Sequence, residues 1–467
     1  MKASKIQNLR NKKGANAYTQ RDLAALLSFV RFRCLSADQL YRLHYRVSSN
    51  KSTTGGYSFF VKKFRYFKKD GVIQLVLSRN GLTPDIYALT GLGYRFVKEH
   101  FPDLFCDAED EEDQIFSINI DYRKLNPAPS IIPHQYYLNN FAIDLLEMFH
   151  NVDGIKYVDE RHMTLTKILR PDGLVLIPQK TVTVDGFQQT IPETRIFLEC
   201  DMGTERTSVI ANKCSCYRRF LASSDHNPNS RVAILFICKS SLPANLNDKK
   251  TLTFLKTQTA RRRESTLRKC ICDNIIDMIG DNTEVLVGSG QKLLDDVKRT
   301  YLYDYFSEHA EDCVNNTEEK IEDVLRDHHD SLEIRDVKKF SLMYLQNDKY
   351  AAYAKDQHSG KLFLFLDCRS DPLSAIHKIQ WHKQISQDLI SRGGKQIELV
   401  AVANDLQTFN TINQVCMLET SAYDHVLCTT MDRLRTLPLH KALFKVRSYG
   451  TAVFNSKFDE MIPTNIS

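Results

Sequence analysis

The chain has 467 residues, a net charge of +6 and 42% hydrophobic residues, a composition typical of a soluble globular protein with several domains. No run of about 18 apolar residues is present that could cross a bilayer, and the N-terminus lacks the apolar stretch of a secretory signal. These features argue against a membrane protein and an exported one, so we expect a cytoplasmic location. The 12 cysteines are scattered and lie mostly in apolar runs, which predicts reduced, buried thiols.

Positive charge is concentrated in the first 100 residues, which contain 19 Lys and Arg against 5 Asp and Glu. This segment therefore carries +14, and the remaining residues carry −8. A basic terminal domain of this kind indicates a polyanionic partner, nucleic acid above all. A merely solvated basic surface is the alternative.

Residues 18–46 predict two short helices, each opened by a capping box. Thr19 with Asp22 begins the first helix, and Ser36 with Gln39 begins the second. A third helix is expected from about residue 54 to 69, where Gly71 stops it. Two apolar strands, 72–77 and 86–89, follow with an Asn-Gly step between them, which is a strong hairpin signal.

Three helices and a hairpin, in that order, are the arrangement of a winged helix-turn-helix domain, which we assign to residues 1–105. In that arrangement the third helix enters the major groove and the hairpin flanks the phosphate backbone. A small helical domain that docks on protein is the alternative. The basic residues expected to contact DNA lie on the third helix and in the turn: Lys62, Lys63, Arg65, Lys69 and Arg79.

Acidic and polar stretches mark the boundaries of the other domains. Residues 106–118 contain the run DAEDEED and are expected to be a linker. Residues 119–307 form the central domain, and a second polar stretch separates it from a C-terminal α/β domain at 324–467.

The sequence of the central domain predicts a helix, three strands, a second helix and a fourth strand, in that order. The helix at 134–149 precedes strands at 155–164, 168–177 and 195–201, and the helix at 207–221 precedes the strand at 232–238. This αβββαβ order predicts a mixed α/β layer structure with helices covering a central sheet.

Three carboxylates of this domain are expected to meet. Alternation along the strand puts Glu199 and Asp201 on one face, and a hairpin partner would bring Asp172 alongside Glu199. Acids held this close repel each other unless a cation neutralises them, and all-oxygen ligands suit Mg²⁺ or Mn²⁺. We therefore predict a metal site at Asp172, Glu199 and Asp201, with structural acids at a strand end as the alternative.

Pro171-Asp172 followed by Glu199-x-Asp201 within an αβββαβ order resembles the PD-(D/E)xK restriction-endonuclease fold. That resemblance implies a nuclease in which the aspartate and the glutamate hold metal. Asp201 departs from the pattern, because lysine usually stands at its position. Lys213 on the following helix is a candidate for the missing positive charge, and a solvated surface lysine is the alternative.

A narrower resemblance covers about residues 18–240. The basic N-terminal domain, the Glu199–Glu205 stretch and the helix with Lys213 together resemble the replication-relaxation family, which includes MOBC-type conjugative relaxases related to restriction endonucleases. The further residues of this resemblance are His134, Asn139, Glu205 and Tyr217. Tyr136, Tyr137 and Tyr217 are possible nucleophiles, although aromatic residues on such helices more often serve packing.

This family resemblance implies a DNA-nicking relaxase that acts on double-stranded and nicked DNA at a plasmid or integrative-element transfer or replication origin, with other relaxosome proteins as further partners. Two other functions stay open. One is a non-catalytic origin-binding accessory protein, and the other is a winged-helix transcription regulator, which would need an apolar ligand pocket.

The strand sequences of the C-terminal domain weakly resemble those of the central domain. Strands expected at 362–367, 397–402 and 426–430 resemble 196–201, 232–237 and 285–289. Asp367 would correspond to Asp201, but Phe365 stands where Glu199 would fall. The domain is thus either a degenerate second copy without metal ligands or an unrelated α/β domain.

Overall fold

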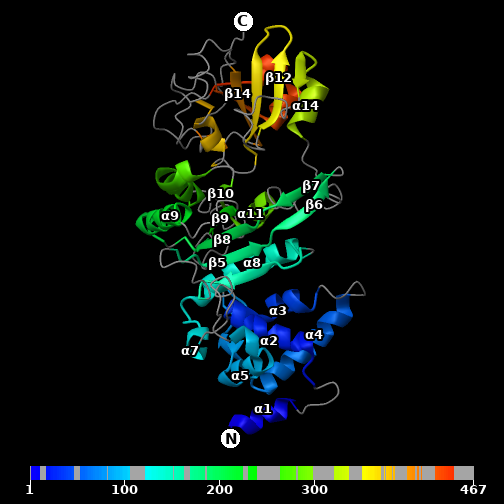
Figure 1. Ribbon diagram of the computed structural model, residues 1–467, viewed down its shortest axis with the longest axis vertical. Coiled ribbons are helices and arrows are strands. Elements are labelled where there is room, and N and C mark those ends of the chain that lie inside the picture. The colour runs from blue at the N-terminus through cyan, green and yellow to red at the C-terminus, as the bar shows by residue number, and fades with distance from the viewer. Residues whose placement is uncertain are drawn as a thin grey trace. The chain divides into compact units, whose positions relative to one another are not determined.

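The computed structural model describes most of the chain between residues 2 and 445. The described residues are 2–10, 17–46, 53–80, 83–105, 121–150, 152–161, 169–184, 187–203, 205–223, 230–238, 263–279, 282–297, 320–335, 350–369, 397–404, 426–445 and parts of 373–383 and 408–412. They divide into two compact units. The first comprises 1–205, 219–260 and 288–305, and the second 206–218, 261–287 and 306–467. Helices and several sheets make this a mixed α/β protein, as expected (Figure 1).

The first helices of the chain begin where their capping residues predict. After α1 (Lys2–Arg10), the helix α2 (Gln20–Phe32) starts with the Thr19 hydroxyl accepting a hydrogen bond from the Asp22 amide at 3.2 Å. The helix α3 (Ala37–His44) starts with the same exchange between Ser36 and Gln39. Both predicted capping boxes are therefore confirmed.

The third expected helix and the hairpin are also present. Helix α4 (Thr53–Lys69) is followed by β2 (Ile73–Leu77) and β3 (Ile86–Leu89), which pair antiparallel. The two-residue strand β1 (Leu35–Ser36) completes a sheet of order β1-β3-β2. Beyond it lie α5 (Gly91–His100), the 3₁₀ helix η2 (Pro102–Phe105) and the short α7 (Tyr122–Leu125).

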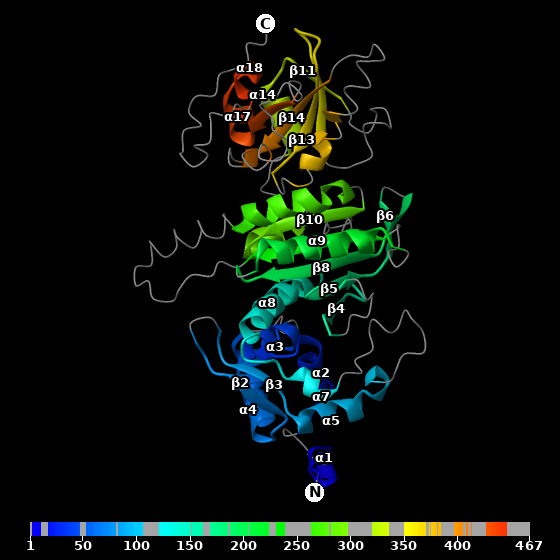
Figure 2. The ribbon, with the colours of Figure 1, turned by 90° about the vertical axis from the view of Figure 1, so that its left-hand side faces the viewer.

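The first unit also contains the larger sheet, in which four strands follow the order β9-β8-β5-β4 (Figures 1 and 2). Their bounds are β4 Lys156–Asp159, β5 Gly173–Ile177, β8 Thr194–Asp201 and β9 Arg231–Cys238. Pairing is antiparallel except between β8 and β9, which run parallel. Helix α8 (Ile132–Met148) precedes these strands and packs on β5 and β8, and α11 (Gly290–Val297) packs on α8.

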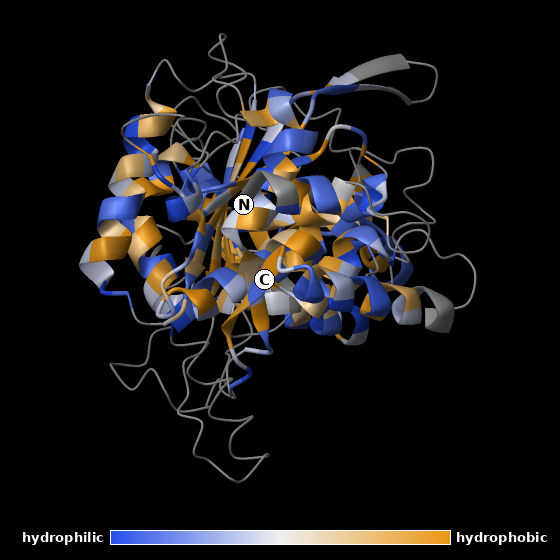
Figure 3. Cartoon of the chain, turned by 90° about the horizontal axis from the view of Figure 1, so that it is seen from below, coloured by the Kyte–Doolittle hydropathy of each residue, from blue (hydrophilic) through white to orange (hydrophobic). Residues whose placement is uncertain are grey.

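This element order is the predicted one, with two differences. Strands β4 and β5 are shorter than expected, and a separate hairpin of β6 (Lys180–Val184) and β7 (Phe187–Ile191) precedes β8. Helix α9 (Thr207–Leu221) forms where the sequence predicts it. Strands β5, β8 and β9 are buried almost throughout, which explains their nearly continuous apolar sequences. Figure 3 colours the described residues by hydropathy, and many of its strand residues are in the hydrophobic colour.

The second unit contains a five-stranded sheet of order β11-β12-β13-β14-β15. Its strands are β11 Leu332–Arg335, β12 Tyr350–Asp356, β13 Leu362–Asp367, β14 Ile397–Ala403 and β15 Val426–Thr430. The helices α14 (Ile321–His328) and α17 (Met431–Thr436) share its hydrophobic core, and α18 (Leu439–Ala442) follows. The strand β10 (Thr283–Gly288) matches the expected 285–289.

The second sheet repeats the order and the strand directions of the first. In both, the first three strands are antiparallel and the next is parallel: β4-β5-β8-β9 corresponds to β11-β12-β13-β14. A helix precedes each set, α8 in one case and α14 in the other. The two sheets therefore share the order and directions of four strands.

The nine cysteines that the structure describes are thiols outside any disulfide, and eight of them are buried. This agrees with the expectation of reduced thiols. Among the described helices, none is long and apolar enough to cross a membrane.

Candidate functional site

The exposed face of α4 is basic. The side chains of Lys62, Arg65 and Lys69 are exposed, whereas the aromatic rings of Phe60 and Phe64 pack inward. Arg79 in the connection after β2 is exposed as well, and its amide donates to the Asp85 carboxylate at 2.8 Å. Four of the five predicted DNA contacts therefore lie on the surface.

Lys63 is the exception, and its prediction as a DNA contact is wrong. Its side chain is 8% exposed and forms an ion pair with Asp22, with 3.0 Å between Lys63 Nζ and Asp22 Oδ2. The same ammonium donates to the Ala17 carbonyl, and Asp22 also accepts a hydrogen bond from the Tyr45 hydroxyl. Neighbouring helix positions differ by about 100° in direction, so Lys62 and Lys63 face different surroundings.

Large aromatic side chains lie among the basic residues of α4. Tyr57 is 50% exposed, Phe59 48% and Tyr66 36%. Aromatic rings beside Lys and Arg are typical of nucleic-acid-binding surfaces, because rings contact sugars and bases while the cations contact phosphates. These rings were not predicted from the sequence, although Phe59 directly precedes the buried Phe60 and Tyr66 directly precedes the buried Phe67.

The second group of candidate residues lies at the carboxyl end of β8. Strand β5 pairs with β8 so that Gly173 faces Leu198, and one residue further in this register Asp172 falls opposite Glu199. The Cys200 amide donates a hydrogen bond to Asp172 Oδ2 at 2.8 Å. The strand register thus places Asp172 opposite Glu199, but the predicted group of three metal ligands is not found among the described residues.

His134, in the first turn of α8, lies next to Cys200 and Asp172. Its Nε2 lies 3.0 Å from the Cys200 carbonyl oxygen and 3.4 Å from Asp172 Oδ2. Because a carbonyl oxygen only accepts, the proton is on Nε2 in this arrangement. About a third of the His134 side chain is exposed, so this imidazole reaches from the strand end towards solvent.

The two acids of β8 are more deeply placed than Asp172. Glu199 and Asp201 are each 2% exposed, whereas the Asp172 side chain is 19% exposed. Asp201 Oδ1 accepts a hydrogen bond from the Gly203 amide at 2.9 Å, in a turn where Gly203 has a φ of +81°. Glycine suits this left-handed conformation, which lets the chain leave the strand while holding the Asp201 carboxylate.

The chemistry of these acids fits a hard divalent cation only in part. Carboxylate oxygens are the donors that Mg²⁺ and Mn²⁺ prefer, and Mg²⁺ commonly takes one or two carboxylates together with water and phosphate oxygens. Within the described ranges, no three His, Cys, Asp or Glu side chains are grouped so that they alone would hold a metal ion. Asp172, Glu199 and Asp201 are therefore not grouped as three protein ligands of one metal ion.

Three other predicted residues lie on or just before α9. Lys213 and Glu205 are half-buried. Tyr217 is fully buried, which is the environment of a packing residue and not of an accessible nucleophile. Lys213 and Tyr217 belong to the second compact unit, whereas the acids belong to the first.

A polar junction holds α8, and with it His134, against the N-terminal helices. Asn139 Nδ2 donates to the carbonyls of Phe32 at 3.0 Å and Cys34 at 2.7 Å. Arg42 of α3 forms ion pairs with Asp144 and Glu147 of α8. Asn139, one of the residues of the family resemblance, thus has a structural role here. The pairing of Arg42 had no local sequence signal, since its partners lie about 100 residues away.

Comparison with known proteins gave one result. Residues 26–234 match a family model described as Replication-relaxation, a span that runs from within α2 to within β9. It contains the basic face of α4 and all three acids at the end of β8. Neither the curated proteins nor the solved structures gave a match.

Proposed function

On the premise that residues 26–234 belong to the replication-relaxation family, we propose that this protein nicks one DNA strand at a replication or transfer origin of a plasmid or integrative element. The family supports a role in replication or mobilisation, and the nicking activity is our proposal. The observation that supports it is the hydrogen bond from the Cys200 amide to Asp172, because it ties this acid to the strand that carries Glu199 and Asp201.

In this proposal the basic N-terminal domain binds the duplex as a winged helix. Lys62, Arg65 and Lys69 would contact phosphates and release counterions, and Arg79 would contact the backbone from the hairpin. Such contacts supply affinity and position the DNA. The junction of Asn139 and Arg42 would transmit that position to α8, because it fixes the helix that carries His134.

The strand-end residues would carry the chemistry. One or two of the carboxylates of Asp172, Glu199 and Asp201 would hold Mg²⁺ or Mn²⁺ together with water and phosphate oxygens, and the bound ion would neutralise and polarise the scissile phosphate. The Cys200 amide and the His134 imidazole orient Asp172. The His134 Nε2 proton is directed at the Cys200 carbonyl, and the His134 side chain is 31% exposed. His134 is therefore our candidate for donating a proton to a phosphate or leaving oxygen.

A non-catalytic origin-binding protein is the second candidate function. The burial of Glu199 and Asp201, at 2% exposure each, favours it, because a phosphodiester would need a rearrangement to reach either carboxylate. Such a protein would use the same basic face of α4 and keep the acids as structural groups.

The test is conversion of supercoiled plasmid bearing the protein's own origin to the nicked form, with and without Mn²⁺. We expect wild-type protein to nick in Mn²⁺ and Asp172→Asn to lose at least about a hundredfold in rate. Both should bind the origin duplex with similar affinity, since the basic face supplies the binding. Origin binding without any nicking by wild-type protein at all Mn²⁺ and Mg²⁺ concentrations would establish the accessory function instead.

A further inference from the structure

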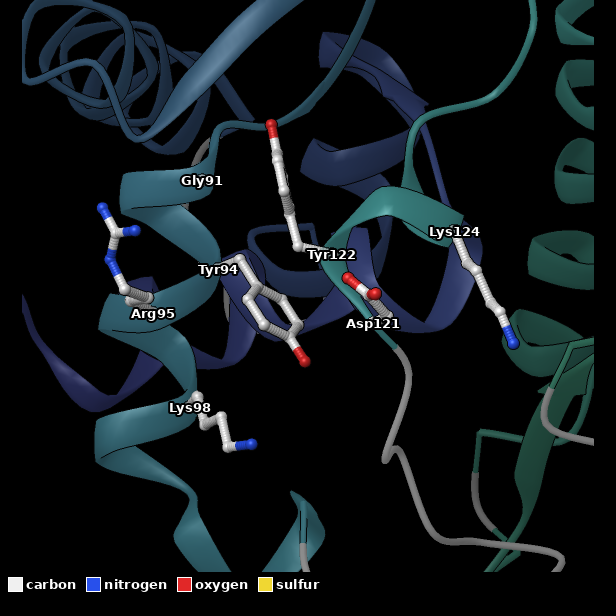
Figure 4. A pocket seen from close by; sticks show the side chains of 7 residues that line it. All are labelled: Gly91, Tyr94, Arg95, Lys98, Asp121, Tyr122 and Lys124. Carbon is white, nitrogen blue, oxygen red and sulfur yellow. The ribbon is translucent and has the colours of Figure 1, made fainter.

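A cavity of about 520 Å³ lies between α5 and α7 in the first unit (Figure 4). This volume falls in the range of roughly 300–1,000 Å³ that is usual for small-ligand pockets. The proposed function uses none of the residues that line it. Two tyrosines, three cationic side chains and one acid make up the functional groups of its wall: Tyr94, Tyr122, Arg95, Lys98, Lys124 and Asp121.

The two tyrosines give the cavity an aromatic wall. The ring centroids of Tyr94 and Tyr122 are 5.9 Å apart, with 41° between the ring planes. The ring of Phe105 packs edge-to-face against the ring of Tyr94, with 5.6 Å between the ring centroids. Burial raises the pKa of Tyr94, and the nearby Asp121 adds to the rise, so its hydroxyl stays a neutral donor. A planar, apolar group is the ligand that such a wall accommodates.

The cations give the cavity an excess of positive charge. Arg95 and Lys98 come from α5 and Lys124 from α7, against the single carboxylate of Asp121. Lys98 and Lys124 are exposed, and Asp121 already accepts a hydrogen bond from the Arg123 amide at 3.0 Å. This charge balance favours an anionic ligand.

Arg95 provides an independent sign of a missing partner. Its Nε is buried and has no hydrogen-bond acceptor among the described residues. Buried donors in proteins are almost always satisfied, and leaving one without an acceptor costs about 1–3 kcal/mol. An acceptor oxygen from a ligand in this cavity would be such a partner for the guanidinium.

We propose that this cavity binds a nucleotide unit of single-stranded DNA, with a base against Tyr94 and Tyr122 and phosphates on Arg95, Lys98 and Lys124. The strand must be unpaired, because in a duplex the faces of the bases are covered by their neighbours. This site does not depend on the nicking chemistry. It would hold a strand that has been separated from its complement, while α4 holds the duplex.

The test is fluorescence anisotropy of a labelled dT12 oligonucleotide with the full-length protein. We expect Tyr122→Ala to weaken dT12 binding about tenfold, since stacking on an aromatic ring contributes roughly 1–3 kcal/mol per base. Tyr122→Phe keeps the ring and should retain the wild-type affinity. The double variant Lys98→Gln with Lys124→Gln should weaken binding as well and reduce its salt dependence. Arg123→Gln is the matched control, because it removes a neighbouring charge that does not line the cavity.

Competition with dTMP and with inorganic phosphate identifies the source of the ligand. We expect both to displace dT12 only at concentrations at least about tenfold above that of unlabelled dT12, because a strand makes more contacts. Displacement by dTMP as readily as by dT12 would make this a site for free nucleotides, and displacement by phosphate alone would make it an anion site. Either result overturns the proposal, as does unchanged dT12 affinity in both Tyr122→Ala and the lysine double variant.

The same assay separates this proposal from the proposed function. The variant Lys62→Gln, Arg65→Gln and Lys69→Gln should lose duplex affinity and keep its affinity for dT12. Tyr122→Ala should behave in the opposite way, with duplex affinity within about twofold of wild type. Equal losses for both probes in Tyr122→Ala, with unfolding curves that match wild type, would contradict a separate single-strand site.

Discussion

The two large sheets have the same order and directions, yet the ends of their corresponding strands differ in chemistry. At the end of β8, Asp201 accepts a hydrogen bond from the amide two residues on, that of Gly203, at 2.9 Å. At the end of β13, Asp367 accepts the equivalent bond from the Arg369 amide, also at 2.9 Å. The Arg369 guanidinium in addition contacts both oxygens of Asp367, at 2.6–3.1 Å.

Two sheets with the same strand order and directions therefore differ in the side chains at their strand ends. The backbone bond belongs to the turn that ends the strand, so both sheets retain it. Gly203 has no side chain to donate to Asp201, whereas Arg369 neutralises Asp367 within its own turn. Phe365 also occupies the position of Glu199, and it is fully buried in the core of the second sheet. We therefore expect the first sheet alone to carry chemistry.

The sharpest test of this comparison is the pair Asp201→Asn and Asp367→Asn. The first should lower the rate of plasmid nicking about a thousandfold, because it removes a charged oxygen from the strand-end site. The second should leave the rate within about twofold of wild type. Nicking assays on both folded variants measure this, and equal losses would show that the second sheet is not inert.

The next largest difference is expected in DNA affinity. Lys62→Gln, Arg65→Gln and Lys69→Gln together should weaken duplex binding by about 10- to 100-fold at low salt and reduce the salt slope by about three. The matched control is Lys361→Gln, Arg435→Gln and Lys441→Gln, which removes the same charge from exposed positions of the second unit. The measurement is duplex binding from 50 to 200 mM salt. Equal losses of affinity in the two triple variants would refute the assignment of the α4 residues as DNA contacts.

Low pH should lower the folding stability of the first unit because of His44. Burial lowers the pKa of His44 to about 4, and Arg31 and Arg21 contribute to the lowering. Since the unfolded chain takes up this proton near pH 6.5, stability falls as the pH drops from about 6.5 to 4, by up to about 3 kcal/mol. The variant His44→Gln should flatten this dependence in thermal unfolding at pH 7 and pH 4.5. His329 in the second unit is also buried with a lowered pKa, so an acid effect that His44→Gln leaves intact would point there instead.

The smallest effect concerns the pair in the second sheet. Arg369→Ala should destabilise that sheet by about 1 kcal/mol, because the contact is bidentate but the Asp367 side chain remains 31% exposed. Hydrogen exchange of the β13 and β14 amides would detect this as a loss of protection of about fivefold. No change there would mean that Arg369 does not stabilise the strand end.

Local patterns in the sequence were sufficient for elements whose physics is local. Thr19, Asp22, Ser36 and Gln39 satisfy each other's backbone groups within one helical turn, so their residue types determine where α2 and α3 begin. The apolar runs of β5, β8, β9 and β13 likewise predicted buried strands, because a strand between two layers must be apolar on both faces. The neighbourhood of Asp172 and Glu199 followed from the antiparallel pairing of two such strands.

Other features depended on contacts between residues far apart in the chain, and only the tertiary structure decided them. Lys62 and Lys63 are the same residue type. Lys63 nevertheless lies in the interior, because it pairs with Asp22, some 40 residues away. Asn139 donates hydrogen bonds to carbonyls more than 100 residues earlier in the chain. Tyr217 is fully buried, and the sequence of its own helix does not determine this burial. The cavity between α5 and α7 also exists only because residues 91–98 and 121–124 meet in space. Such partners leave no periodic signal in the sequence, since each is chosen by the way distant elements pack.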